Sequence, residues 1–156
     1  EALGGSLGWA AGGFLLLKDT LELLEQSENV QDIPPILFRL RLASQQGYAP
    51  ALTACVSCGK KDFDHAGFLV SEGTIVCPDC VSGRGNIVEI SGKSLDVLRQ
   101  VQEVSPLHWH FLTSGSSEET CEVLLPAERR ECARAVDGFV QYHLGLTWDR
   151  GRFRRM

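Results

Sequence analysis

Four of the six cysteines fall into two Cys-x-x-Cys pairs within the stretch ACVSCGKKDFDHAGFLVSEGTIVCPDC. Cys55 and Cys58 form the first pair, and Cys77 and Cys80 form the second after 18 intervening residues. This spacing is typical of a structural zinc site, since each pair sits on a tight turn and a hairpin brings the two turns together. Gly59 permits a positive φ angle, which lets backbone N–H groups point at the sulfurs. We therefore predict that these four thiolates bind a zinc ion.

Two other uses of the thiols stay open at this point. The CPDC stretch alone resembles a thiol–disulfide exchange motif, in which a helix N-terminus activates the first thiol. Here it follows a predicted strand and has a spaced partner pair, which a redox motif does not need. Iron held by the same four thiolates is the less common outcome for this spacing. Four thiolate ligands leave no open coordination position, so a metal here stabilises a module and does not catalyse.

Helical spacing of apolar residues surrounds this segment on both sides. The first predicted helix covers residues 9–26, and the second starts with Asp32 as N-cap and stops at Gly47. The apolar face of the first helix is predicted to contain Leu17, Leu21 and Leu24. The second helix is predicted to bury Ile36, Leu40 and Ala43.

Between and after the cysteine pairs the pattern changes. The runs FLV and TIV around Glu72-Gly73 predict a β-hairpin. A helix is predicted from Ser94 as its cap, and a last helix from near Pro126 to Gly145. The predicted buried residues of these two helices are Leu95, Leu98, Val101, Cys132, Val136, Phe139, Val140 and His143.

These elements predict a mainly α fold with a small zinc-ribbon-like β-hairpin module inserted between helices. We expect three parts: residues 1–49 as one part of the helical core, 50–86 as the four-cysteine module, and 87–156 as the rest of the core with a basic tail.

The chain of 156 residues has a net charge of −5, which argues against a protein that wraps nucleic acid over its whole surface. The charge is uneven: residues 1–32 contain six acidic residues and one lysine, whereas residues 129–156 contain seven arginines and three acidic residues. No stretch is long and apolar enough for a membrane span, and the start lacks the pattern of a secretory signal. We therefore expect a cytoplasmic protein.

No arrangement of side chains predicts catalysis, so we expect a protein that is not an enzyme. Cys132 is expected to be a small buried side chain, and Cys121 lies beside a polar stretch without a paired histidine and asparagine. His108 and His110 flank a tryptophan but lack a third ligand, so packing is the preferred interpretation. His65 lies between the cysteine pairs and is expected to be a solvated loop residue.

Arginines are the remaining candidates for binding. Arg152, Arg154 and Arg155 in the tail WDRGRFRR would contact phosphates with Phe153 stacking on a base, or else form a solvated terminus. The helical pairs Arg39 with Arg41 and Arg129 with Arg130 would suit an acidic peptide.

The order of these motifs resembles the bacterial RecO recombination mediator family. The similarity runs from about Phe14 onward, and its most specific stretch is GYAPALTACVSCG, which joins a helix to the cysteine module; EGTIVCPDC and HLGL follow. The resemblance implies zinc ligands at Cys55, Cys58, Cys77 and Cys80. A zinc-stabilised, protein-binding regulatory module of another system is the alternative.

For function, the resemblance implies a non-enzymatic role in DNA repair. Members act with RecR to displace single-strand DNA-binding protein (SSB) so that RecA loads on single-stranded DNA, and they anneal complementary strands. The family also implies contact with the acidic tail of SSB and a cytoplasmic, nucleoid-associated location. Members begin with an OB-fold barrel, which has no counterpart before Trp9, so we expect this chain to be the helical and zinc-binding part of a longer protein.

Overall fold

The computed structural model describes residues 2–26, 33–109, 124–149 and 152–155, and it describes side chains for 11–26, 33–109 and 124–145. The helices are α1 (Ala2–Gln26), α2 (Ile33–Gln45), α3 (Gly92–Glu103) and α5 (Pro126–Leu144), with single 3-10 turns η1 (Pro78–Cys80) and η2 (Pro106–His108). The strands are β1 (Ala51–Cys55), β2 (His65–Leu69), β3 (Thr74–Val76), β4 (Ile87–Ser91), β5 (Leu146–Asp149) and β6 (Arg152–Arg155).

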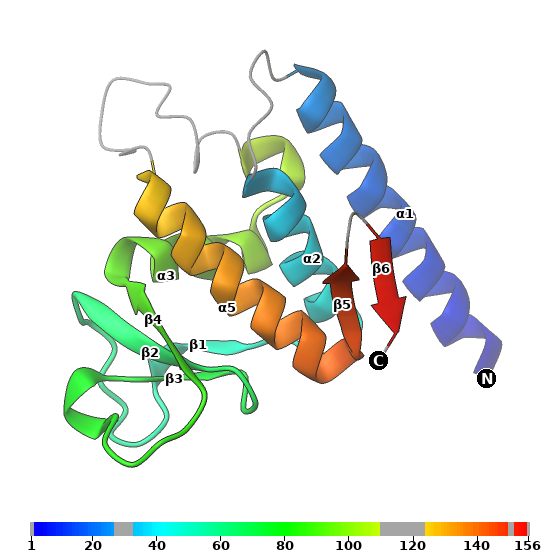
Figure 1. Cartoon of the computed structure of the whole chain (residues 1–156). Coiled ribbons are helices and arrows are strands. Elements are labelled where there is room, and N and C mark those ends of the chain that lie inside the picture. Colours follow the sequence, from blue (N-terminus) through cyan, green and yellow to red (C-terminus); the bar gives the residue numbers. More distant parts are fainter. Residues whose placement is uncertain (1, 27–32, 110–123, 150–151, 156) are drawn as a thin grey trace.

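A helical layer lies over a small sheet, which forms the lower left part of the molecule in Figure 1. The sheet has the strand order β1-β3-β2-β4, so that its two edge strands are the ones that connect to α2 and α3. The module is therefore inserted between two helices, which confirms the predicted fold class. None of the helices in the described part of the chain has the length and apolar character needed to cross a membrane.

The predicted hairpin is present as the antiparallel pair β2 and β3, in which Leu69 is paired with Thr74. Its turn is closed by a 2.8 Å hydrogen bond from the backbone N–H of Gly73 to the carbonyl oxygen of Leu69. Gly73 has a φ angle of +63°, which glycine adopts without a steric penalty. Strands β1 and β4, which the sequence did not predict, widen this hairpin into the four-stranded sheet.

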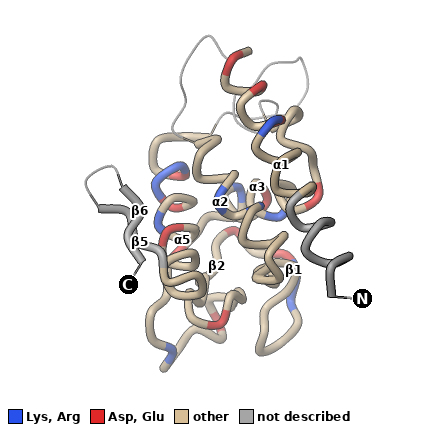
Figure 2. The backbone as a smooth tube through the Cα atoms, turned by 90° about the vertical axis from the view of Figure 1, so that its right-hand side faces the viewer, with Lys and Arg blue, Asp and Glu red and all other residues tan. Residues whose placement is uncertain are grey.

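The main core lies between α2, α3, α5 and the upper face of the sheet. Leu37, Trp109 and Phe139 are among its largest fully buried side chains. The predicted buried residues of α2, α3 and α5 all belong to this core apart from His143, which is half-buried. Arg39 of α2 forms an ion pair with Asp137 of α5 at the edge of the core. Figure 2 shows basic and acidic residues interspersed along the helices.

The predicted apolar face of α1 is wrong. Leu17 and Leu21 are exposed and Leu24 is half-buried, whereas the buried residues are Leu16 and Leu23. Between them on the buried face, the Thr20 hydroxyl is satisfied by a 2.7 Å hydrogen bond to the carbonyl oxygen of Leu16. Apolar residues occur on several sides of this helix, so packing against α2 decides which side is buried, and spacing alone does not.

The predicted cap of α3 is also wrong by one turn. Ser91 is the N-cap, and its hydroxyl accepts a hydrogen bond from the backbone N–H of Ser94. Both serines have capping chemistry, and the helix begins at the first because Gly92 and Lys93 adopt helical backbone angles. Gly145 ends α5 in the left-handed conformation with φ of +62°, as predicted.

The C-terminal stretch is a β-hairpin in the structure and not a frayed tail. Strands β5 and β6 pair antiparallel, with Trp148 opposite Phe153 and Thr147 opposite Arg154. The hairpin follows α5 directly after Gly145, and its first strand, β5, lies close to α5.

Candidate metal centre

The backbone of the module brings the two cysteine pairs together at the C-terminal ends of two neighbouring strands. Strands β1 and β3 run parallel, and Cys55 ends β1 while Cys77 directly follows β3. Parallel neighbours that end at the same level place the residues at their C-terminal ends side by side. The predicted hairpin contributes β3, but the parallel neighbour β1 completes the arrangement.

A tight turn after β1 turns the first pair inward. The backbone N–H of Gly59 donates to the carbonyl oxygen of Cys55 at 2.9 Å, and that of Cys55 donates to the carbonyl oxygen of Lys60 at 2.8 Å. Gly59 has a φ angle of +75°, as its place after the second cysteine predicts. On the other side, the backbone N–H of Cys77 donates to Sγ of Cys55 at 3.3 Å. Backbone donors therefore do point at a sulfur of the cluster.

The four sulfur atoms fit a tetrahedral metal site. All of them lie within 4.8 Å of one another, and Sγ of Cys58 is 3.7 Å from Sγ of Cys77. A zinc ion about 2.3 Å from each of four tetrahedral sulfurs separates those sulfurs by about 3.8 Å. The predicted ligand set Cys55, Cys58, Cys77 and Cys80 therefore has the spacing that a tetrathiolate site requires.

The protonation of the thiols also favours a cation at this point. Burial raises the pKa of Cys55, but hydrogen bonds from backbone N–H groups, led by that of Cys77, outweigh this effect and lower the pKa from 9.0 to about 6. The neighbouring thiols of Cys77 and Cys58 raise the pKa of Cys80 to about 12. One thiolate thus forms readily while further ionisation is opposed by its neighbours, and a divalent cation removes that opposition.

The burial of Cys77 disfavours thiol–disulfide exchange. Cys77, the first cysteine of CPDC, has no exposed surface, whereas an exchange motif presents its first cysteine to the partner. The CPDC stretch also opens only the three-residue turn η1, which lacks the dipole of a full helix.

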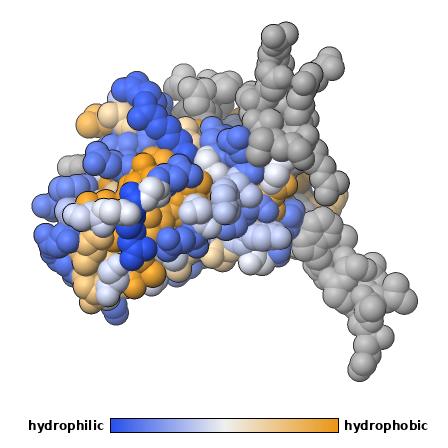
Figure 3. Space-filling model, turned by 60° about the horizontal axis from the view of Figure 1, so that its bottom comes forward, coloured by the Kyte–Doolittle hydropathy of each residue, from blue (hydrophilic) through white to orange (hydrophobic). Residues whose placement is uncertain are grey.

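A small cluster of apolar side chains packs against the cysteines of the site. Leu69 and Val76 are buried beside Cys55 and Cys77, and Val81 and Ile87 pack against them. Gly67 permits this packing, because a Cβ atom there would lie 2.7 Å from Cγ2 of Ile87. Figure 3 turns this end of the molecule forward and shows an apolar patch among hydrophilic residues. Val56, in the turn after β1, is 48% exposed.

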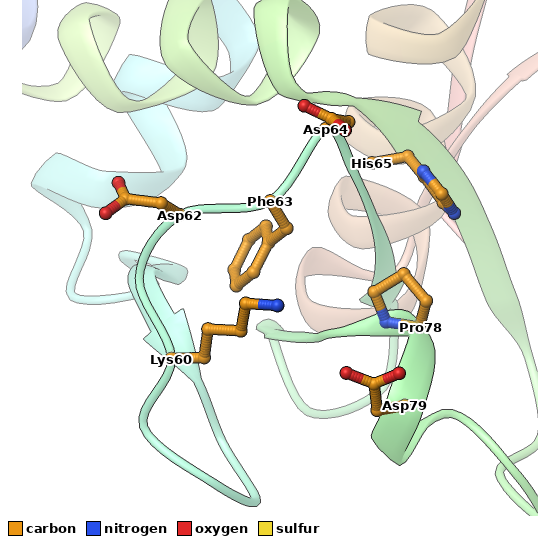
Figure 4. Close-up of a pocket in the computed structure, with 7 residues that line it drawn as sticks. All are labelled: Lys60, Asp62, Phe63, Asp64, His65, Pro78 and Asp79. Atoms are coloured by element: carbon orange, nitrogen blue, oxygen red, sulfur yellow. The ribbon is translucent and has the colours of Figure 1, made fainter.

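A hollow of about 350 Å³ lies next to the cysteine turns, as Figure 4 shows. Its lining residues are Lys60, Asp62, Phe63, Asp64, His65, Pro78 and Asp79. His65 is exposed on the wall of this hollow and does not belong to the sulfur cluster, as expected, but it is the first residue of strand β2 and not a loop residue.

The family model described as recombination protein O C terminal matches residues 11–152, which include all four cysteines. The chain belongs to the RecO C-terminal family. Proteins named DNA repair protein RecO are 46% identical over the whole chain in Nitratidesulfovibrio vulgaris strain Hildenborough and 41% identical in Oleidesulfovibrio alaskensis. In Lawsonia intracellularis the identity is 37%, again over the whole chain.

The chain spans 60% of the length of these RecO relatives. No solved structure gives a significant match to it. The recognition of the RecO family from GYAPALTACVSCG and the order of the later motifs is therefore confirmed.

The helical arginines singled out in this RecO chain have different surroundings. Arg39 binds Asp137, and Nη1 of Arg41 donates to the carbonyl oxygen of Val101 at 3.2 Å. Nε of Arg129 donates to the carbonyl oxygen of Leu124 at 3.2 Å. Arg39 and Arg41 therefore join α2 to α5 and to α3, whereas Arg129 makes a local contact at the start of α5. Arg130 is exposed, as is Arg134, one turn further along α5.

The remaining candidates divide into described and undescribed residues. Cys132 is fully buried, as predicted, and burial raises its pKa to about 12. His108 is exposed in η2 beside buried Trp109. His110 and Cys121 lie outside the described residues. Arg152, Arg154 and Arg155 lie in strand β6.

Sequence reasoning missed an aromatic cluster at the C-terminal end of α5. The ring centroid of His143 is 4.4 Å from that of Phe139, 5.1 Å from that of Tyr142 and 6.0 Å from that of Tyr48. The GYAP motif contains one of these residues, but only the fold brings it to α5.

Proposed function

We propose that this chain holds one structural zinc ion through Cys55, Cys58, Cys77 and Cys80. The proposal is supported by the mutual distances of the four sulfurs and by the backbone hydrogen bond to Cys55. When bound, zinc supplies no catalytic chemistry here, because four thiolates fill its coordination sphere. The chain's own contribution is to fix the two turns and to keep Cys55 and Cys77 away from water.

We further propose that the chain is the helical and zinc-binding part of a non-enzymatic recombination mediator in DNA repair. The observation that carries this is the match of the RecO C-terminal family to residues 11–152. In this role it acts with RecR and SSB to expose single-stranded DNA for RecA, and it supports annealing of complementary strands. A cytoplasmic, nucleoid-associated location follows from the role.

The contact with the acidic SSB tail is proposed to use the exposed basic side of α5. Arg130 and Arg134 are four residues apart and therefore neighbours on one helix face. The other helical arginines are already engaged within the fold, so they are less available to a peptide. An acidic peptide gains charge-assisted hydrogen bonds from free guanidinium groups.

The test is fluorescence anisotropy of a labelled acidic SSB-tail peptide titrated with the chain at low and at moderate salt. We expect binding that weakens with salt and that falls several-fold in the double variant Arg130→Ala with Arg134→Ala. The double variant Lys60→Ala with Lys61→Ala removes the same charge from the module and serves as the control. An equal loss in both variants, or no binding by the folded zinc-loaded chain, would contradict the assignment.

A further inference from the structure

Two exposed tyrosines and a histidine form a continuous aromatic surface where α5 meets the sheet module. Tyr142 is 60% exposed and Tyr48 is 44% exposed, and the half-buried ring of His143 lies between them. The three residues come from the C-terminal end of α5 and from the loop between α2 and β1. Large exposed aromatic side chains in a group are uncommon on a soluble protein and point to a binding surface.

Contacts with the protein interior hold the His143 ring of this surface in place. Nε2 of His143 lies 3.2 Å from the carbonyl oxygen of Val70, in the turn that joins β2 to β3. Phe139, one turn earlier on α5, is fully buried and its ring lies 4.4 Å from that of His143. Gly138 lets α5 approach this turn, because a Cβ atom there would lie only 3.3 Å from both methyl groups of Val70. The orientation of the ring therefore does not have to be fixed at the moment of binding, which lowers the entropic cost.

We propose that Tyr48, Tyr142 and His143 form a stacking surface for the unpaired bases of single-stranded DNA. Aromatic faces stack on bases of any sequence, and each such contact contributes substantially to affinity. In a duplex the base faces are covered by their neighbours, so flat exposed rings favour a single strand. The inference rests on the proposed function, since that function requires contact with single-stranded DNA.

The C-terminal hairpin brings the backbone of an arginine close to the end of α5. Gly145 ends α5 immediately after the cluster, and in the following hairpin Arg155 is paired with Leu146, two residues beyond the end of α5. Its second strand, β6, carries Arg152, Arg154 and Arg155. Guanidinium groups bind phosphates while aromatic rings bind bases, and these two features together are the usual composition of a single-strand site. An acidic peptide would also suit the arginines, but it has no need of paired flat rings.

The experiment compares two labelled strands of equal length, oligothymidylate and the same backbone without bases. Anisotropy titration of the 156-residue chain should show tighter binding to the strand with bases. Tyr142→Ala should weaken binding to oligothymidylate about tenfold and leave the abasic strand unaffected. Tyr142→Phe keeps a ring and should keep the preference for bases. Phe14→Ala removes a 67% exposed ring on α1, away from the cluster, and should change neither affinity.

A second readout locates the contact. An oligonucleotide containing 5-iododeoxyuridine, irradiated in the complex, should form a cross-link within the peptides that contain Tyr48 or Tyr142. Equal affinity for both strands, an unchanged preference in Tyr142→Ala or cross-links confined to other peptides would overturn the stacking surface. The SSB-tail peptide is titrated with the same preparations. Intact peptide binding then shows that the stacking surface alone has failed, whereas loss of both activities also overturns the proposed function.

Discussion

Ser94 Oγ donates a 2.7 Å hydrogen bond to Glu131 Oε2, which joins the first turn of α3 to α5. The same carboxylate oxygen accepts from the backbone N–H and from the hydroxyl of Ser91, both at 2.9 Å. Ser91 is the last residue of β4. One side chain thus connects the cysteine module to two helices of the core. Partial burial raises the pKa of Glu131, but the donors from Ser91 and Ser94 outweigh it and hold the pKa below its usual value.

Glu131→Gln should destabilise the chain by about 2 kcal/mol at neutral pH, because the charged acceptor of three donors is lost. Since the pKa is lowered by folding, the benefit of the carboxylate is fully present above its unfolded value of 4.5 and is lost as the pH falls through the folded value. The difference between wild type and variant should therefore shrink in acid. Urea denaturation across this pH range measures it, and Glu103→Gln, an exposed change on α3, is the control. A pH-independent difference would contradict the role of the charge.

One zinc ion per chain is expected by elemental analysis of protein purified without added metal. Cys77→Ser should abolish this content, because Cys77 is a buried member of the sulfur cluster. Cys132→Ala should retain it, since Cys132 lies in the helical core. Chelation should expose β1 and β3 to hydrogen exchange, because the metal contributes much of the stability of such a small module. Iron in place of zinc, or full zinc content in Cys77→Ser, would refute the assignment.

Gly73→Ala should cost more stability than Gly83→Ala, although both glycines have positive φ angles of +63° and +79°. A Cβ atom at Gly73 would lie 2.7 Å from Cε2 of Phe139, whereas one at Gly83 meets nothing within 4 Å. The backbone cost of about 1 kcal/mol is common to both variants. Overpacking should add about 1–3 kcal/mol for Gly73→Ala alone. Thermal unfolding of both variants measures the difference in stability. An equal loss of stability in the two variants would show that the Phe139 ring moves aside without cost.

Cys132 should resist alkylation in the folded chain. Its thiol is fully buried, and burial raises its pKa to about 12, so the reactive thiolate is scarce. After metal chelation, iodoacetamide should modify exposed Cys58 while Cys132 stays unmodified until denaturant is added. Peptide mass spectrometry distinguishes the sites. Early modification of Cys132 would indicate that α5 opens locally in the native state.

The parts of the structure that the sequence predicted depend on local chemistry. The two Cys-x-x-Cys turns, Gly59, the hairpin turn at Gly73 and the helix stop at Gly145 each follow from a few adjacent residues. Such signals are readable because a positive φ angle or a thiolate pair imposes the same local geometry in most folds. The buried stripes of α3 and α5 were readable because only one side of each helix is rich in apolar residues.

The parts that the sequence did not predict depend on distant partners. Strand β1 is defined by its parallel pairing with β3, about twenty residues later in the chain, and its five residues show no clear alternation. The face of α1 is chosen by α2, since its apolar residues point several ways. Arg39 joins α2 to α5 because it forms an ion pair with Asp137, which lies 98 residues away in the sequence. Pairwise tertiary contacts of this kind leave no local pattern.

The position of the cysteine module between α2 and α3 has a consequence for the order of folding. Contact between α2 and α5, such as that of Arg39 with Asp137, requires closure of a long loop, and loop closure slows folding as sequence separation grows. The module lies within that loop, and its two cysteine pairs are close in sequence. If the module folds first, the flexible part of the chain between α2 and α5 becomes shorter. The folded module also fixes the points at which α2 and α3 join the sheet, since these helices connect to its two edge strands, β1 and β4. During synthesis it is complete before α5 has been made, so the last helix docks onto a prepared surface.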